Sequence, residues 1–440
     1  MLSIHVTKRA VCVLCLTVLK TSVSEGFLSA PFKADLLVAR CRLLQNPTVR
    51  YPPALTIVRS STESPQITTI STRYLVVDAL LTKKSSDPIE QLSRHPQFVT
   101  LSTRDRAFCR RLLTTVQRRK GQIEKVLDHC QTQKNRRTKE ECLLQTVLAV
   151  GAAQLLFLET PAHAAVKETV DVLRMNFKDR KAISETKIKF VNALLRRLSR
   201  EGPTLLAECS SVEDNAAPWL IESWKKAWGE EATHKILEAS MVESPRCITV
   251  KGYIPGQSKS VLEEIAGTFE NATILPQGSI RIDHPPSGPI SDWPGYEEGT
   301  WWLQDVAATI PAMALYQELS RKGSAQGQHV VDLCASPGGK TAQLSSYGFG
   351  SVTAVEISNR RSKRLKENKE RLNMDWDIHI ADASQWQTDQ KIQGILADVP
   401  CTATGTASKR PDVLRRDASY DDLLQTQLDI TCHAIDNLLD

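Results

Sequence analysis

The stretch "HVVDLCASPGGKTAQL" (329–344) constrains the fold of this chain more than any other. An apolar run of strand length leads into a loop with two adjacent glycines, and a helix begins there. One interpretation is a Walker A phosphate loop, whose tail Gly339-Lys340-Thr341 is present. That motif needs a glycine five residues before Gly339, and this chain has Cys334 there. We therefore favour a cofactor-binding turn, in which glycines let the backbone approach a ligand beside a helix N-terminus.

Three further strand patterns follow this loop, and each carries an acid at or near its end. They are "SVTAVEI" (351–357), "DIHIAD" (377–382) and "QGILADV" (393–399), with Glu356, Asp382 and Asp398 as the acids. The carboxyl ends of parallel strands share one edge of an open sheet, where ligands bind. We therefore expect an α/β domain of the Rossmann type with its site at that edge. A nicotinamide cofactor is the weaker alternative, because the loop reads PGGKT rather than GxGxxG.

The sequence upstream of this domain predicts helices. Apolar residues recur at helical spacing in "RDRAFCRRLLTTVQRRKGQIEKVLDHC", "ECLLQTVLAVGAAQLLFL" and "KFVNALLRRLSREG". Pro161 separates two helices, and Gly202-Pro203 is expected to end the last one. A chain of 440 residues is too long for one core, so several domains are expected. We assign an all-α domain to 74–215, a small α+β connector to 216–300 and the α/β domain to 301–440.

Residues 1–73 have the composition of a targeting leader. Lys8 and Arg9 precede the apolar run "AVCVLCLTVL", which is too short to span a membrane and suits a signal segment. Between residues 27 and 73 the only acids are Asp35 and Glu63, as in transit peptides. The pairing resembles the bipartite plastid leader of algae with complex plastids. It predicts an organelle, with the plastid favoured over the mitochondrion or cytoplasm; a secretory signal and a disordered tail are the alternatives.

Charge and cysteine usage limit the partners. The formal net charge of +6 is a mild excess that permits nucleic acid without requiring it. The eleven cysteines form no paired CxxC pattern, which argues against a zinc site and favours free thiols in a reducing compartment. We therefore expect neither a metal nor a membrane as a partner, and a monomer.

Several quoted motifs resemble the Sun/Nop family of S-adenosylmethionine-dependent RNA cytosine-C5 methyltransferases. They are "DLCASPGGKT", "AVEIS", "ADVPCTATGT", "RPDVLRR" and the lead-in "YEEGTWWLQDVAATIPA" (296–312). "DRAFCRRLL", "VGAAQLLFLETPAHAAVKETV" and "FVNALLRRL" resemble, in the same order, the NusB-like RNA-binding domain of the Sun/Fmu-type members. The likeness covers roughly residues 75–440. Ser336 and Val399 depart from it, because the family usually has alanine at both positions.

The resemblance implies the cofactor, the substrate and the roles of individual residues. The cofactor is S-adenosylmethionine, and the substrate is RNA, expected to be rRNA, with a cytosine that is single-stranded or flipped. The implied cofactor-binding residues are Cys334, Ala335, Ser336, Pro337, Gly338, Gly339, Lys340, Glu356, Asp382 and Asp398. Glu356 is expected to hold the ribose and Asp382 to lie on the adenine side. The implied catalytic residues are Cys401, Asp398 and Lys340.

Cytosine C5 is a poor nucleophile, so the implied chemistry is covalent: a thiolate adds to C6 before C5 takes the methyl group. In the resembled family the cysteine of the Asp-x-Pro-Cys motif, here Cys401, helps release the product. The nucleophile lies in a later Thr-Cys motif after another strand. Thr431-Cys432 has these letters but falls inside a helical pattern, so we interpret Cys432 as a helix-face residue. We therefore expect an incomplete α/β sheet. The alternative is an RNA-binding protein without catalysis.

Overall fold

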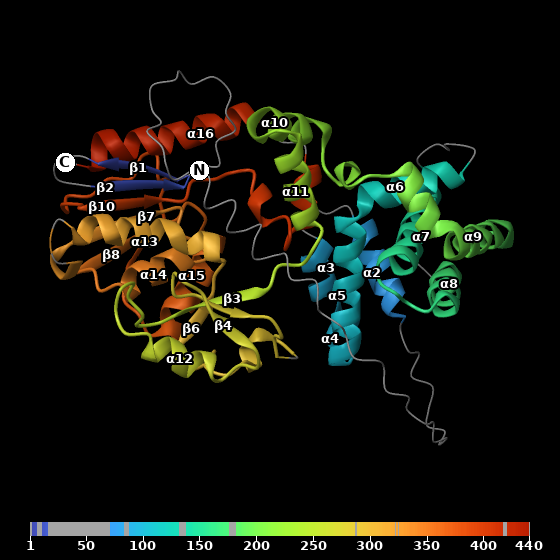
Figure 1. The fold of residues 1–440 in the computed structure, drawn as a ribbon, viewed down its shortest axis with the longest axis horizontal. Helices are drawn as coiled ribbons and strands as arrows, with labels where there is room; N and C mark the ends of the chain where they lie inside the picture. The colour runs from blue at the N-terminus through green and yellow to red at the C-terminus, as the bar shows by residue number, and fades with distance from the viewer. Residues whose placement is uncertain are drawn as a thin grey trace. The chain divides into compact units, whose positions relative to one another are not determined.

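The structure is a computed structural model that describes residues 2–6, 11–15, 71–82, 88–131, 138–175, 182–286, 288–321, 323, 325–416 and 420–439. The chain divides into two compact units (Figure 1). The helical unit holds the described residues between 71 and 243 together with residues 404–416, and the sheet unit holds the rest. Residues 2–6 and 11–15 belong to the sheet unit.

Helices build the first unit, as the periodicity predicts. They are α2 (Thr72–Leu81), α3 (Pro88–Arg94), α4 (Pro96–Val99), α5 (Thr103–Arg118), α6 (Lys120–Cys130), α7 (Lys139–Phe157), α8 (Ala162–Asp171), α9 (Glu185–Cys209), α10 (Pro218–Trp228) and α11 (Glu230–Ser240). Short 3-10 turns follow some of them: η1 (Val172–Arg174), η2 (Val212–Asn215), and from much later in the chain η5 (Thr404–Thr406) and η6 (Pro411–Arg415). Within the described residues, α7 is long and apolar enough to cross a membrane by length and composition, but half of its most apolar window is buried inside the protein.

Helix α9 runs past the stop that the sequence predicts. Gly202-Pro203 was expected to end it, yet the helix continues through Pro203 to Cys209. The buried face continues over this point through Leu198, Gly202 and Leu205, so packing outweighs the backbone hydrogen bond that proline lacks. The approach is close at Gly202, where a Cβ would lie 2.5 Å from Leu156 Cδ2 and would displace that side chain. The expected break at Pro161 is confirmed, since α7 ends at Phe157 and α8 begins at Ala162.

The sheet unit contains the predicted parallel sheet. Its strands are β7 (His329–Leu333), β8 (Ser351–Val355), β9 (Asp377–His379) and β10 (Gly394–Ala397), in the order β10-β7-β8-β9. All neighbouring pairs among these four are parallel. The helices are α13 (Val306–Ser320), α14 (Gly339–Ser346), α15 (Asn359–Leu372) and α16 (Tyr420–His433), the last continuing as η7 (Ala434–Leu438). The α/β fold of the Rossmann type is therefore confirmed.

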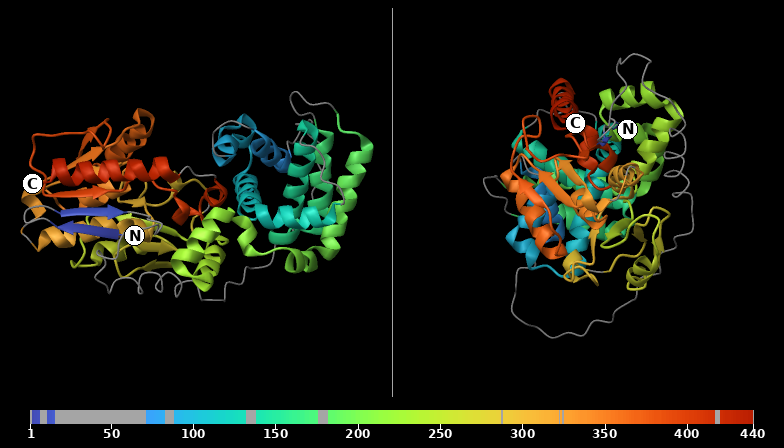
Figure 2. Two further views of the ribbon diagram at one scale, coloured as in Figure 1. Left: turned by 90° about the horizontal axis from the view of Figure 1, so that it is seen from above. Right: turned by 90° about the vertical axis from the view of Figure 1, so that its left-hand side faces the viewer.

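Strands β7, β8 and β10 are buried on both faces, whereas the short edge strand β9 is largely exposed. Val330, Val352 and Leu396 pack with α13, α14 and α15, whereas Val331 and Ile395 pack with residues of α16 and η7. Helix α16 accordingly lies along one face and α13 to α15 along the other (Figures 1 and 2). This burial explains why the strands read as nearly continuous apolar runs.

The sheet continues past β10 with two strands from the start of the chain. Strand β2 (Val11–Cys15) pairs parallel with β10, and β1 (Leu2–Val6) pairs antiparallel with β2. The sequence patterns predict that the sheet ends at residues 393–399 and that this segment is a leader outside the fold. An unpaired strand edge offers N–H and C=O groups to any extended apolar segment, and the valine-rich run supplies one. The address function of residues 1–73 stays a prediction, and residues 16–70 lie outside the described residues.

A small antiparallel sheet belongs to the same unit. Its strands are β3 (Arg246–Val250), β4 (Ala272–Ile274), β5 (Ile280–Ile282) and β6 (Trp301–Leu303), in the order β4-β5-β3-β6, with α12 (Ser260–Ala266) packed against them. A short turn, η3 (Ile290–Asp292), precedes β6. The α+β character predicted for 216–300 thus applies from Ser244 onward, while α10 and α11 belong to the helical unit.

Candidate active site

The loop after β7 is held in a tight, left-handed turn. Cys334 has φ 66° and Gly338 has φ 102°, and Gly338 is the residue that caps α14. The Gly338 N–H donates to the Ala335 carbonyl at 2.8 Å, and Ala335 N–H donates to the Val355 carbonyl at 3.0 Å. A Cβ at Gly338 would lie 2.8 Å from Leu365 Cδ1. Glycine is therefore required here by conformation and by space.

Helix α15 fixes the outer side of this loop. Arg361 Nη2 donates to the Ser336 carbonyl at 3.0 Å, and Asn368 Nδ2 donates to the Pro337 carbonyl at 2.8 Å. The basic helix α15 thus supports the glycine loop. The sequence does not reveal this role, because the contacts link residues about thirty positions apart and leave no periodic signal.

Glu356 follows β8 and is buried beside the same loop. Its carboxylate accepts the Ser336 N–H at 3.3 Å and the Ser358 N–H at 2.9 Å, and Arg361 Nη2 lies 3.5 Å from Oε2. A carboxylate oxygen has two lone pairs, so each oxygen can accept a further hydrogen bond. The predicted neighbourhood of the loop and Glu356 is present in the structure.

Lys340 and Asp398 meet at the edge of the sheet. Lys340 is the second residue of α14, Asp398 follows β10, and Lys340 Nζ lies 2.5 Å from Asp398 Oδ2. The Lys340 side chain is 15% exposed and that of Asp398 is 38% exposed, so the carboxylate remains open to solvent while its partner is largely covered. The Asp398 N–H donates to the Leu333 carbonyl at 3.3 Å, which ties the two strand ends together.

A further carboxylate, Asp332, lies beneath this pair and was missed from sequence. It belongs to β7 and is 1% exposed. Burial raises the pKa of Asp332 to about 7, against the lowering effects of the Thr341 hydroxyl bond and of Lys340. Thr341 Oγ1 donates to Asp332 Oδ2 at 2.6 Å, whereas Asp332 Oδ1 is buried without a hydrogen-bond partner. The sequence offers one signal of this contact: an acidic residue inside an otherwise apolar strand, nine residues before a threonine.

The two cysteines of the motifs differ in environment. Burial raises the pKa of Cys334 to about 12, and the charges of Asp332, Glu356 and Asp398 act in the same direction. Its thiol is therefore neutral at ordinary pH and packs as an apolar group. Cys401 is half-buried in the loop after Asp398.

Helix α16 anchors the loop that carries Cys401. Gln427 is buried, and its Nε2 donates to the Pro400 carbonyl at 2.6 Å. The role of Gln427 is not visible in the sequence, because a polar residue in a helical pattern does not indicate which distant group it contacts. On the same helix Cys432 is exposed, which confirms its interpretation as a helix-face residue.

Asp382 is placed differently from the other predicted residues. It lies after β9 and is exposed, and its Oδ1 accepts the Ser384 N–H at 2.9 Å and the Ser384 hydroxyl at 2.8 Å. These bonds close a local turn. Its expected place on the adenine side stays a prediction.

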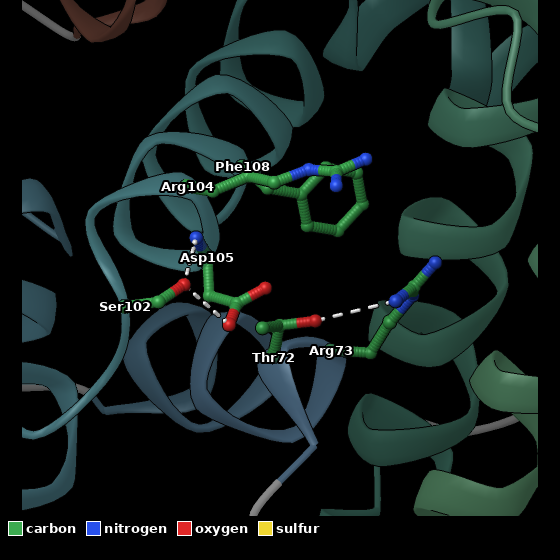
Figure 3. Close-up of a pocket in the computed structure, with 6 residues that line it drawn as sticks. All are labelled: Thr72, Arg73, Ser102, Arg104, Asp105 and Phe108. Atoms are coloured by element: carbon green, nitrogen blue, oxygen red, sulfur yellow. Dashed lines mark hydrogen bonds between the residues drawn. The ribbon is translucent and has the colours of Figure 1, made fainter. Parts of the chain in front are cut away.

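A separate pocket of about 450 Å³ lies in the helical unit. Thr72, Arg73, Ser102, Arg104, Asp105 and Phe108 line it (Figure 3). Arg73 forms an ion pair with Glu168, and its Cζ lies 4.7 Å from the centroid of the Phe108 ring. The Ser102 hydroxyl donates a hydrogen bond to Asp105 Oδ2 at 2.7 Å. None of the predicted site residues belongs to this pocket. Across the described residues, no group of three or more His, Cys, Asp or Glu could hold a metal ion, and metal independence stays a prediction.

The parallel sheet, its glycine loop and the acids at its carboxyl edge define a Rossmann-type domain with a ligand site of the kind that methyltransferases use. Comparison with known proteins agrees. Residues 323–439 match the family described as 16S rRNA methyltransferase RsmB/F, and residues 71–200 match the NusB family. Ribosomal RNA small subunit methyltransferase B of Cronobacter sakazakii is 30% identical over 344 residues, which are 75% of each chain. The same enzyme of Escherichia fergusonii is 30% identical over 342 residues, again 75% of each.

This chain belongs to the RsmB/F family of 16S rRNA methyltransferases. It is accordingly an enzyme of the RNA methyltransferase class, joined to a NusB-like helical domain. A solved structure titled PH0851 shares the fold, with a TM-score of 0.57 at 18% identity over 84% of this chain and 82% of that chain.

Proposed function

We propose that this protein transfers a methyl group from S-adenosylmethionine to C5 of a cytosine in small-subunit rRNA, as a monomer without a metal. The contact between Lys340 Nζ and Asp398 Oδ2 at the joined ends of β7 and β10 carries the proposal. It places an oriented, solvent-facing carboxylate beside the glycine loop and three residues before Cys401. The relatives' names, which specify ribosomal RNA of the small subunit, support the choice of substrate.

The loop fits S-adenosylmethionine by the groups it leaves unsatisfied. Asp332 Oδ1 and Ser336 Oγ are buried without hydrogen-bond partners among the described residues, as expected of a site that a polar ligand completes. We propose that residues 334–340 and Glu356 hold this cofactor, with Glu356 accepting bonds from its ribose. When bound, the cofactor supplies an electrophilic methyl group. Asp382 is proposed to lie near the adenine.

The protein's own groups then act on the base. A thiolate adds to C6 of cytosine, C5 takes the methyl group, a base removes the C5 proton, and the thiolate leaves. We propose that Asp398 forms a hydrogen bond with the edge of the base and that Lys340 orients the Asp398 carboxylate. Cys401 is proposed to help release the product. In the resembled family the attacking thiolate belongs to a later Thr-Cys motif, and Cys432, which lies exposed on a helix, is not given this role.

Covalent trapping tests this proposal. We expect the 440-residue chain to bind S-adenosylmethionine, and a form that includes the later Thr-Cys motif to form an adduct with RNA containing 5-azacytidine. The adduct is measured as a shifted band that survives denaturation. Intact cofactor binding with no adduct in the extended form would contradict the cytosine assignment and favour an RNA-binding role.

The division of labour between the cysteines has its own test. Cys401→Ala in the extended form is expected to slow release, so that the adduct with unmodified RNA accumulates. Cys432→Ala on the exposed face of α16 is the matched control and should behave as wild type. Loss of all adduct in Cys401→Ala would instead make Cys401 the nucleophile.

We also propose import into an organelle, with the plastid favoured. The composition of residues 1–73 supports this, since acids are nearly absent between residues 27 and 73. A fluorescent protein fused after residue 73 should accumulate in the plastid, and a cytosolic signal would contradict the proposal.

A further inference from the structure

The segment that follows the Cys401 loop is built into the helical unit. We call the described part, residues 404–416, the anchor segment. Although it connects β10 to α16, both of the sheet unit, the anchor segment itself belongs to the helical unit. Cys401 therefore lies three residues from the point where the chain enters the helical unit.

Arg118 of α5 holds the anchor segment by a buried hydrogen bond. Its Nη2 donates to the Ser408 carbonyl at 2.8 Å, and Arg118 is 8% exposed. Burial lowers the pKa of the Arg118 guanidinium, and its Nε is buried without a hydrogen-bond partner. A buried charge is costly unless it is well bonded, so the Ser408 carbonyl is an important partner for this side chain.

Other contacts fix the second half of the anchor segment. Arg415 Nη1 donates to the Asp214 carbonyl at 3.0 Å, and Arg415 Nη2 lies 2.8 Å from Glu124 Oε2. The Ala217 N–H donates to the Leu414 carbonyl at 2.8 Å. The approach is close at Gly121, where a Cβ would lie 1.6 Å from the Asp214 carbonyl oxygen and 2.7 Å from Arg415 Nη1.

Apolar burial supports the same attachment. The anchor segment buries Ala407, Val413 and Leu414, each 1% exposed. Burying side chains of this size stabilises a segment by about 1 kcal/mol or more each. The anchor segment is therefore a structural part of the helical unit and not a loop lying on its surface.

Cys401 thus stands between two anchored stretches of chain. On its N-terminal side, Asp398 is held by Lys340, and the Pro400 carbonyl is held by Gln427. On its C-terminal side only Thr402 and Ala403 separate it from the anchor segment, and Ala403 has the restricting φ of 56°. A loss of order in the anchor segment would therefore reach the Cys401 loop directly along the chain.

We propose that Arg118 is a positioning residue for Cys401: the helical unit holds the anchor segment and thereby fixes the conformation of the loop that carries the thiol. The NusB-like domain would then hold the stretch of chain that follows Cys401. The catalytic meaning of this role rests on the proposed function, since that proposal gives Cys401 its part in the reaction.

Hydrogen exchange and thiol alkylation of the full chain test the positioning role. Arg118→Met keeps most of the side-chain volume and removes the donors. We expect amide exchange in the anchor segment to accelerate about tenfold, which corresponds to about 1.4 kcal/mol. Alkylation of Cys401 by iodoacetamide, followed by peptide mapping, should accelerate in proportion. Cys109 and Cys247 are buried in the two units, and their unchanged rates would report intact cores.

Arg111→Met is the matched control, because Arg111 is exposed on the same helix and the change in charge is identical. It should leave both rates at the wild-type value, and Arg118→Lys should restore part of the protection. Faster exchange in the anchor segment with an unchanged Cys401 rate would overturn the proposal, as would unchanged exchange.

If Arg118→Met disrupts the helical core, Cys109 will be alkylated faster, and a second variant is then needed to test the positioning role. Arg415→Gln removes the contacts to Asp214 and Glu124 at a side chain that is 32% exposed. Parallel acceleration of the anchor segment and Cys401 supports the proposal, and an unchanged Cys401 rate overturns it. Alkylation needs neither RNA nor cofactor, so its outcome is independent of whether the proposed methyl transfer is correct.

Discussion

Asp332 is a single buried side chain that contributes to the pH dependence of stability. Its pKa is raised to about 7 in the folded protein, from an ordinary value of 3.8. Between these values the folded protein holds a proton that the unfolded chain has lost, so the free energy of unfolding falls as pH rises. The stabilising contribution is complete below about pH 4 and is lost as pH passes through 7.

We therefore expect Asp332→Asn to remove this slope. From pH 5 to pH 8 the wild type should lose about 2 kcal/mol that the variant retains, because the amide cannot ionise. Urea unfolding at the two pH values measures the difference. Asp389→Asn, at an exposed aspartate, should keep the wild-type slope. Equal pH dependence in wild type and Asp332→Asn would show that the Asp332 carboxyl does not titrate in this range.

Helix α14 depends on a glycine at each end, and the two glycines serve different purposes. Gly338 caps its start with φ 102°, and Gly348 follows its last turn with φ 77°. A Cβ at Gly338 would lie 2.8 Å from Leu365 Cδ1, whereas nothing lies within 4 Å of one at Gly348. Alanine therefore adds backbone strain at both sites and a clash at only the first.

We expect Gly348→Ala to cost about 1 kcal/mol of unfolding free energy, and Gly338→Ala to cost about 1–2 kcal/mol more. Only Gly338→Ala should weaken S-adenosylmethionine binding, because it moves the loop from Cys334 to Lys340. Urea unfolding and calorimetric titration measure the two effects. If both variants lost the same stability and kept wild-type cofactor binding, the loop would accommodate the added Cβ at residue 338 without moving.

Individual elements could be predicted where a local pattern specifies them. The strands after the glycine loop and the acids that close them follow from apolar runs and position alone. Helix α9 could not be delimited in this way, because packing around Gly202 carries it through Pro203. Gln427 and Asp332 escaped notice for a related reason, since their roles come from partners on other elements.

At the scale of the whole molecule, the order of domains could be read from sequence but the division of the chain could not. The anchor segment lies within residues 301–440, which sequence analysis assigned to the α/β domain, yet it packs in the helical unit. Residues 2–6 and 11–15 lie far from β10 in sequence, yet they extend its sheet. Both features depend on pairing between distant segments, and local propensity carries no information about such pairing.

The two units have separate hydrophobic cores, which predicts two separable unfolding events. Leu148 of α7 and Leu396 of β10 are each fully buried, one in each core. Leu148→Ala should cost the helical unit about 2–5 kcal/mol, and Leu396→Ala should cost the sheet unit a similar amount. Hydrogen exchange at increasing urea concentration reports the midpoint of each segment.

In the comparison of these two variants, the anchor segment shows with which unit it unfolds. It is covalently continuous with β10 and α16, but its contacts lie in the helical unit. We therefore expect Leu148→Ala to lower the urea midpoints of α7 and of residues 404–416 together while β7 keeps the wild-type midpoint. Leu396→Ala should lower the midpoint of β7 and spare α7 and residues 404–416. If the anchor segment instead followed β7 in both variants, the loop after Cys401 would depend on the sheet unit alone.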